Sequence, residues 1–204
     1  MEKKLILVSG KMQSGKNTFA DLLSEELVSS GKTVRFDLFA KSLKDGVWDD
    51  FYALHTFVYR EYWKLPPEVR HLVKWMNVEK DNFYENKSEY GRLLLQIYGT
   101  EIFRNRVDDL YWVKTVEKRY VGQEEQYCVV TDVRFPNEIE YFKSHYPNVV
   151  TIRVNRTNRN GKVFNDEHFS EKALDGYSNF DIVVDNDGSL EELSEKVKSL
   201  VTEL

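Results

Sequence analysis

The pattern of apolar and polar positions predicts five short strands in this chain of 204 residues. They are expected at about residues 3–9, 32–36, 126–131, 148–154 and 180–184. Several of these segments are nearly continuous in apolar residues, which is typical of strands buried on both faces. Helical segments separate most of them. An alternation of strands and helices indicates an α/β fold with a parallel sheet covered on both sides.

The expected helices follow from apolar residues at helical spacing. The first spans about residues 17–30 and ends before Gly31, a second starts at Phe39, a third ends near His145, and the last begins after Ser189. Glu192 lies three residues after Ser189, which completes a capping-box pattern. The apolar faces of the first and last helices consist of Ala20, Leu22, Leu23 and Leu27, and of Leu190, Leu193, Val197 and Leu200.

The middle of the chain, from about residue 45 to 123, carries no convincing strand pattern. It contains many aromatic residues and is interrupted by prolines at 66–67 and by a polar stretch at 82–88. We expect helices here, with the loop at about 80–87 as its least ordered part. The aromatic residues could stack on a base but more simply form a helical core; they are Tyr52, Phe57, Tyr59, Tyr62, Trp63 and Trp75.

Composition adds little that is specific. Charged residues make up 31% of the chain and the formal net charge is −5, which argues against binding a nucleic acid through a basic face. Cys128 is the only cysteine and lies in an apolar stretch, so we expect a buried thiol and no disulfide within the chain. No signal sequence or membrane-spanning run is evident, and a cytoplasmic protein is expected.

Residues 10–18 read GKMQSGKNT and follow the first predicted strand directly. A glycine-framed loop between a buried strand and a helix brings backbone N–H groups and a helix N-terminus toward a phosphate chain, and Lys16 would reach the outer phosphates. The P-loop pattern G-x-x-x-x-G-K-[ST] is complete except for its last position. Asn17 stands there in place of the hydroxyl residue that contacts Mg²⁺, and its amide oxygen is a weaker substitute. The alternative is an ordinary glycine turn.

Two further strand ends are expected to be polar, and ligands bind at the carboxyl ends of strands in such sheets. Asp132 and Arg134 follow the third strand, while Arg156 and Arg159 follow the fourth. An acid can hold Mg²⁺ through water, and arginines can neutralise a phosphoryl group during transfer. The combination predicts phosphoryl transfer. The simpler alternatives are a helix-capping or turn acid at Asp132 and a solvated loop around the two arginines.

Five segments together resemble one family. They are residues 10–18 (GKxxSGKNT), 39–44 (FAxxLK), 94–101 (LLQxxGTE), 131–138 (TDVRFPNE) and 168–171 (HxSE). In this order they are similar to the deoxynucleoside monophosphate kinases of tailed bacteriophages. The first motif is shared with phosphomevalonate kinase, a more distant relative, whereas the third and fourth favour the nucleotide kinases.

This resemblance implies a doubly wound P-loop core of the nucleoside monophosphate kinase type, formed by about residues 1–44 and 124–204 of a single domain spanning residues 1–204. It implies a helical acceptor-binding insertion at about 45–123 and a lid at about 155–179. It also implies ATP as donor, Mg²⁺ as cofactor and a deoxynucleoside monophosphate as acceptor. The partners would be these small molecules, with no nucleic acid polymer and no membrane. A homodimer stays open, and a phage-encoded protein would work in the host cytoplasm.

The resemblance also assigns candidate residues. Those expected in catalysis are Lys16, Asp132, Arg134, Arg156 and Arg159, with Asn17 and Asp132 supporting the metal. Those expected to bind ATP are Gly10, Lys11, Gln13, Ser14, Gly15, Lys16, Asn17, Thr18, Asn186 and Gly188. Those expected to bind the acceptor are Lys41, Lys44, Arg92, Gln96, Thr100, Arg104, Asp132, Arg134 and Glu171.

Some of these assignments have simpler alternatives. Residues 92, 96, 100 and 104 recur at spacings of four and share a helical face, which could equally be solvated. Lys41 and Lys44 could be surface lysines, and residues 186–188 could form a plain turn. Two other functions stay open for the chain as a whole: a kinase for another phosphorylated small molecule, as in phosphomevalonate kinase, and a nucleotide-dependent switch or assembly module.

Overall fold

The structure is a computed structural model and describes residues 3–47, 49, 64, 67, 95–157 and 168–204. The chain divides into two compact units. The first unit comprises residues 1–39 and 113–204, and the second comprises residues 40–112. Each unit is described by itself below.

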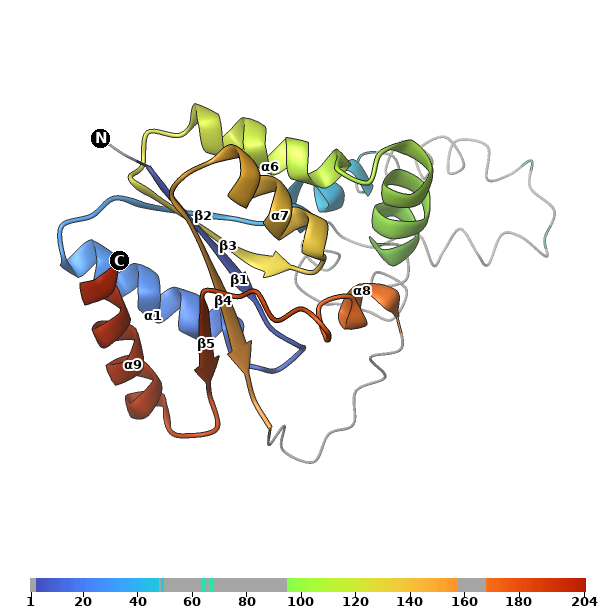
Figure 1. Cartoon of the computed structure of the whole chain (residues 1–204). Coiled ribbons are helices and arrows are strands. Elements are labelled where there is room, and N and C mark those ends of the chain that lie inside the picture. The colour runs from blue at the N-terminus through green and yellow to red at the C-terminus, as the bar shows by residue number, and fades with distance from the viewer. Residues whose placement is uncertain (1–2, 48, 50–63, 65–66, 68–94, 158–167) are drawn as a thin grey trace. The chain divides into compact units, whose positions relative to one another are not determined.

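A five-stranded parallel sheet forms the centre of the first unit (Figure 1). Its strands are β1 (Lys4–Ser9), β2 (Val34–Asp37), β3 (Tyr127–Val133), β4 (Val149–Asn155) and β5 (Ile182–Asp185). Their order across the sheet is β2-β3-β1-β4-β5. Consecutive strands are therefore joined by crossovers, and the predicted parallel α/β sheet is confirmed.

Helices cover both faces of this sheet (Figure 1). Helices α1 (Lys16–Ser29) and α9 (Leu190–Glu203) pack together on one face, in an apolar cluster with β1, β3 and β4. Helices α6 (Tyr111–Gly122) and α7 (Pro136–His145) lie on the other. Because β1 is central, residues 5–8 are completely buried. This burial on both faces explains the continuous apolar run that predicted the strand.

Strand pairing moves two predicted boundaries. β3 continues to Val133, which pairs with Ser9, so that Asp132 lies inside the strand rather than after it. β4 continues to Asn155, which pairs with Asp185. In both cases the backbone hydrogen bonds of the neighbouring strand extend the element beyond its apolar run. The segment 155–179, for which a lid is expected, contains the short helix α8 (Phe169–Lys172).

The described part of the second unit is helical. Residues 40–47 continue a helix that starts at Phe39, and Ile97–Val107 form a π-helix, η2. The Nε1 of Trp112 donates a hydrogen bond to the carbonyl of Gly99 at 2.8 Å. Tyr98, Phe103, Tyr111 and Trp112 form a chain of ring contacts. The loop at 80–87 and the aromatic residues between 52 and 75 lie outside the described residues. Across the described ranges, no helix is long and apolar enough to cross a membrane.

Candidate functional site

The loop that joins β1 to α1 has the backbone of a phosphate-binding loop. Gln13 and Gly15 have φ angles of 61° and 84°, so the chain turns twice through the left-handed region before α1 begins at Lys16. The N–H of Ser14 donates to the carbonyl of Lys11 at 3.1 Å. Alternating left- and right-handed residues turn successive N–H groups into one concavity, at the positive end of the α1 dipole.

Two glycines in this loop are sterically required. A Cβ on Gly10 would lie 2.4 Å from the Oγ of Ser14 and 2.7 Å from the carbonyl oxygen of Val154. A Cβ on Gly15 would lie 2.1 Å from the Nδ2 of Asn186, in addition to the strain of its positive φ. The loop is therefore packed tightly against β4 and against the residues that follow β5.

The loop residues fit the phosphate group that the sequence predicts. The Oγ of Ser14 is buried and has no hydrogen-bond partner in the described part of the chain, which is unusual for a buried hydroxyl. The Nζ of Lys16 lies 3.5 Å from the carbonyl oxygen of Lys11, too far for a strong bond. Asn17 and Thr18 are exposed in the first turn of α1.

Asp132, one of the two predicted metal ligands, already has a partner in the protein. One carboxylate oxygen of Asp132 accepts the backbone N–H of Phe39 at 2.8 Å, which gives Asp132 a structural role. A carboxylate can accept several hydrogen bonds at once, so this contact does not by itself prevent Asp132 from holding a water of a bound Mg²⁺. Among the described residues, no group of three or more acidic, histidine or cysteine side chains could hold a metal ion by itself.

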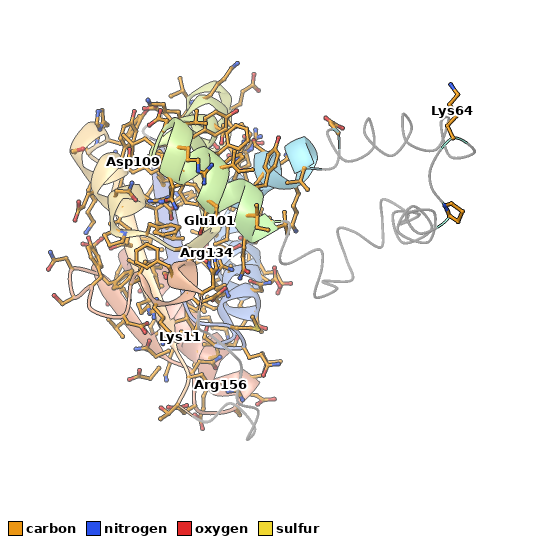
Figure 2. The ribbon with its side chains drawn as sticks, turned by 90° about the vertical axis from the view of Figure 1, so that its right-hand side faces the viewer. Lys11, Lys64, Glu101, Asp109, Arg134 and Arg156 are labelled. Atoms are coloured by element: carbon orange, nitrogen blue, oxygen red, sulfur yellow. The ribbon has the colours of Figure 1, made fainter. Side chains whose placement is uncertain are left out.

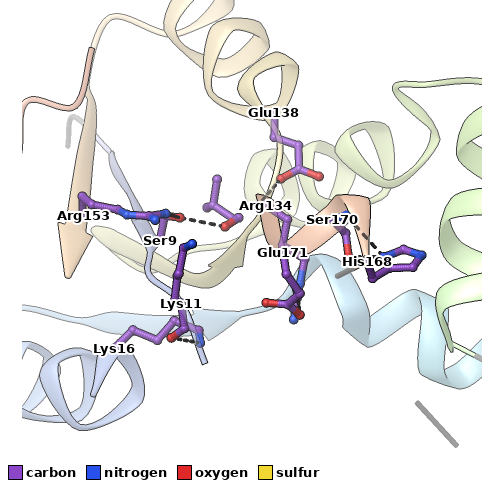
Figure 3. A network of polar contacts seen from close by, with 10 residues as sticks. Ser9, Lys11, Lys16, Arg134, Glu138, Arg153, His168, Ser170 and Glu171 are labelled. Atoms are coloured by element: carbon purple, nitrogen blue, oxygen red, sulfur yellow. Dashed lines mark hydrogen bonds and ion pairs between the residues drawn. The ribbon is translucent and has the colours of Figure 1, made fainter. Parts of the chain in front are cut away.

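Arg134 lies just beyond β3 and forms an ion pair with Glu171 of α8 (Figure 3). The buried carboxylate of Glu138 accepts the backbone N–H groups of Arg134 and Phe135, at 2.8 and 3.1 Å. It thereby caps the start of α7 and fixes the backbone that carries Arg134. The structure thus brings two predicted acceptor residues, Arg134 and Glu171, together.

A second polar network starts at Ser9, the residue before the loop, and involves residues that no sequence motif marked. Arg153 of β4 donates to the Oγ of Ser9 at 2.9 Å (Figure 3). It also approaches Asp175 at 3.8 Å. Asp175 in turn pairs with Lys11 at 2.7 Å. Arg153 and Ser9 occur within apolar strands, and only the register of β1 with β4 brings them together.

At the ends of β4 and β5, the structure places Arg156 and Asn186. The Nε of Arg156 is buried and has no hydrogen-bond partner in the described ranges. Asn186 donates from its Nδ2 to the carbonyl of Ser14 at 2.9 Å, so it contacts the P-loop itself. Gly188 is exposed next to Glu192 of α9. Lys11, Arg134 and Arg156 are all seen from the side shown in Figure 2.

The remaining predicted residues lie in the second unit or outside the described residues. Lys41, Lys44, Gln96, Thr100 and Arg104 belong to the second unit. Thr100 and Arg104 are buried, so the helical face that they were predicted to share is not fully solvated. Arg92 and Arg159 lie outside the described residues.

The sheet order and the loop define the class of protein: a P-loop α/β fold. The family model for deoxynucleotide monophosphate kinase matches residues 54–197, so the chain belongs to that family. The loop at 10–18 lies outside the matched residues. Loop and family match are therefore independent observations.

Two curated relatives carry the same name. The deoxynucleotide monophosphate kinases of Escherichia phage RB69 and Enterobacteria phage T4 are each 34% identical, over 113 and 114 residues. These alignments cover 54% and 53% of this chain and 44% of each relative, so the matched region spans less than half of their length. An unliganded sugar kinase from Janibacter sp. HTCC2649 is 12% identical, with 98% of this chain and 95% of that chain covered, but its TM-score of 0.46 is too low to support a function.

Proposed function

We propose that this protein transfers the γ-phosphoryl group of ATP to the 5′-phosphate of a deoxynucleoside monophosphate, giving a deoxynucleoside diphosphate and ADP. The observation that carries the proposal is its membership of the deoxynucleotide monophosphate kinase family together with a P-loop whose glycines leave no room for a side chain. The acceptor oxygen attacks the γ-phosphorus as the bond to the β-phosphate oxygen breaks. The protein needs no nucleophile of its own.

In this proposal, catalysis comes from positioning and charge neutralisation. The loop N–H groups and Lys16 hold the donor phosphates, and Arg134 orients the acceptor phosphate once it exchanges Glu171 for that ligand. Arg156 offers a buried guanidinium nitrogen, Nε, that has no hydrogen-bond partner among the described residues. A Mg²⁺ ion supported by Asn17 and Asp132 would neutralise phosphate charge.

The acceptor region is proposed to be the second unit. Thr100 and Arg104 are buried on one side of η2, with Gln96 at its start. An arginine, an amide and a hydroxyl on one face suit a phosphate and the edge of a base. Lys41 and Lys44, in the helix that starts at Phe39, would add positive charge for the acceptor.

The test is ADP release measured with ATP, Mg²⁺ and each deoxynucleoside monophosphate in turn. Lys16→Ala should lower turnover at least about a hundredfold, because one preorganised charge at a transferring phosphoryl group contributes on this scale. Circular dichroism should be unchanged, since Lys16 is on the loop surface and not in the core. If phosphomevalonate stimulated the release of ADP and no deoxynucleotide did, the result would favour a kinase for another phosphorylated small molecule. Slow release that ignores every acceptor would favour a nucleotide-dependent switch.

A further inference from the structure

The two residues that follow β5 contact two predicted parts of the active site at once. Asn186 is buried, and its Nδ2 donates to the carbonyl of Ser14, in the P-loop, at 2.9 Å. Its backbone N–H donates to the carbonyl of Asn155, the last residue of β4, at 2.8 Å. Asn186 therefore joins the loop after β1 to the ends of β4 and β5.

Asp187 holds the next part of the chain. One carboxylate oxygen accepts the backbone N–H of Thr157 at 2.6 Å, and the other accepts the hydroxyl of Thr157 at 2.7 Å. Thr157 directly follows Arg156, whose Nε is buried without a hydrogen-bond partner in the described residues. Fixing Thr157 at two points limits the positions that the backbone of Arg156 can take.

The chemistry of Asn186 is specific to its place. A carbonyl can only accept, so the amide nitrogen must face Ser14. The absence of a Cβ at Gly15 is what makes the approach possible, because such an atom would lie 2.1 Å from this nitrogen. Because Asn186 holds the carbonyl of the trans peptide unit between Ser14 and Gly15, its N–H is directed to the opposite side, away from Asn186.

We propose that Asn186 and Asp187 form a positioning turn: Asn186 fixes the P-loop for the donor phosphates, and Asp187 fixes the base of the segment that carries Arg156. The proposal rests on the proposed function only in taking a nucleotide phosphate as the ligand of the loop. Neither side chain needs to touch the nucleotide.

The test compares four variants of the full chain, and a fifth that serves as the control, with the wild type. Asn186→Asp keeps the size of the side chain and replaces the donor by an acceptor, and Asn186→Ala removes both. Asp187→Ala removes both contacts to Thr157, whereas Asp187→Asn can keep them. Asp185→Asn is the matched control, an exposed carboxylate one residue before the turn. ADP affinity is measured by calorimetry, and hydrogen exchange is measured on the apo proteins.

Loss of a buried hydrogen bond that leaves its acceptor unsatisfied typically weakens the dependent equilibrium about tenfold. Asn186→Ala should therefore weaken ADP binding about tenfold and Asn186→Asp more strongly, with faster exchange at residues 10–16. Asp187→Ala should leave ADP affinity within about twofold and speed exchange at residues 155–157 about tenfold. Asp187→Asn should restore wild-type exchange, and the control should change neither quantity.

Unchanged ADP affinity in both Asn186 variants, with only a lower urea midpoint, would reduce Asn186 to a structural residue and overturn its part. Exchange at residues 155–157 that is equal in Asp187→Ala and wild type would overturn the part of Asp187. Neither the ADP affinity nor the hydrogen exchange depends on phosphoryl transfer. A wild type that binds ADP but phosphorylates no deoxynucleotide would therefore contradict the proposed function and still decide the role of this turn.

Discussion

An ion pair between Asp37 and Arg119 connects the edge strand β2 to helix α6. Asp37 ends β2 and is buried, and the Nε of Arg119 in α6 donates to both of its carboxylate oxygens, at 3.0 and 2.7 Å. The same guanidinium also donates to the carbonyl of Leu38 at 2.8 Å. A buried carboxylate is tolerated because it is paired in this way.

Cys128 lies beside this pair in β3 and is completely buried. Burial raises the pKa of its thiol to about 12, and the negative charge of Asp37 adds to the rise, while Arg35 and Arg119 oppose it. The thiol is therefore neutral throughout the physiological range. This agrees with the expectation, drawn from its apolar surroundings in the sequence, of a structural cysteine.

This pKa predicts how stability depends on pH. The folded-state value lies above that of an unfolded cysteine, which is about 8.5, so the stabilising contribution is complete below pH 8.5 and is lost as the pH rises toward 12. Between pH 8.5 and 10, the free energy of unfolding of the wild type should fall by about 2 kcal/mol more than that of Cys128→Ala. Urea denaturation at both pH values measures it. Parallel losses in the two proteins would show that the thiol ionises as readily in the folded state.

At the scale of elements, helix α8 and the turn after it carry two carboxylates that pair with two cationic residues of the candidate site. Glu171 pairs with Arg134 and Asp175 pairs with Lys11. The backbone N–H of Ser170 donates to the Nδ1 of His168 at 3.2 Å, which caps the start of α8, and the buried side chain of Leu174 anchors its end. The HxSE motif thus has a local structural role: His168 caps α8, and Glu171 pairs with Arg134.

These carboxylates compete with any phosphate for the same cations, which yields a prediction. Asp175→Asn should bind ADP about two- to fivefold more tightly than the wild type, because an exposed ion pair of this kind stabilises by only a fraction of a kcal/mol to about 1 kcal/mol. Calorimetry at low ionic strength measures the difference, which salt should diminish. Glu195→Gln, which breaks an exposed ion pair with Lys198 in α9, is the control. Equal or weaker binding by Asp175→Asn would exclude competition at Lys11.

At the scale of the whole molecule, the candidate residues are divided between the two units. The first unit contains the P-loop, Asp132, Arg134 and Arg156, and the second contains the η2 residues and the two lysines that follow Phe39. One carboxylate, that of Asp132, caps the helix that leads out of the first unit. The proposed donor residues thus lie in the first unit, whereas the proposed acceptor residues come from both units.

The division predicts which ligand protects which segment of the chain. ADP alone should slow hydrogen exchange at residues 10–18, and a deoxynucleoside monophosphate alone should slow it at residues 96–104, each by about tenfold at ligand concentrations ten times the dissociation constant. With both ligands, the segment 155–179 should also become protected if it is the lid that the sequence predicts. Protection of residues 96–104 by ADP but not by any deoxynucleotide would move the acceptor site elsewhere.

The sequence by itself determined the strands, the parallel sheet, the P-loop and the family, because each depends on local patterns. Apolar runs mark buried strands, and the loop motif works through its own backbone. The N-cap of α9 formed as expected too: Ser189 accepts the N–H of Glu192 at 3.3 Å. The exposed first turn of α1 likewise contains Asn17 where the loop motif places it.

Only the tertiary structure decided the contacts between residues far apart in the chain. Asn186 meets Ser14 across 172 positions, and Arg153 meets Ser9 across 144. No local pattern marks such pairs, because they arise from the order and register of β1, β4 and β5 in the sheet. A carboxylate in a sequence also does not reveal its partner. Asp132 and Glu171 were expected to contact ligands. In the folded protein, Asp132 accepts the N–H of Phe39, and Glu171 pairs with the guanidinium of Arg134. A buried or half-buried charge is stable only where a group of complementary polarity faces it.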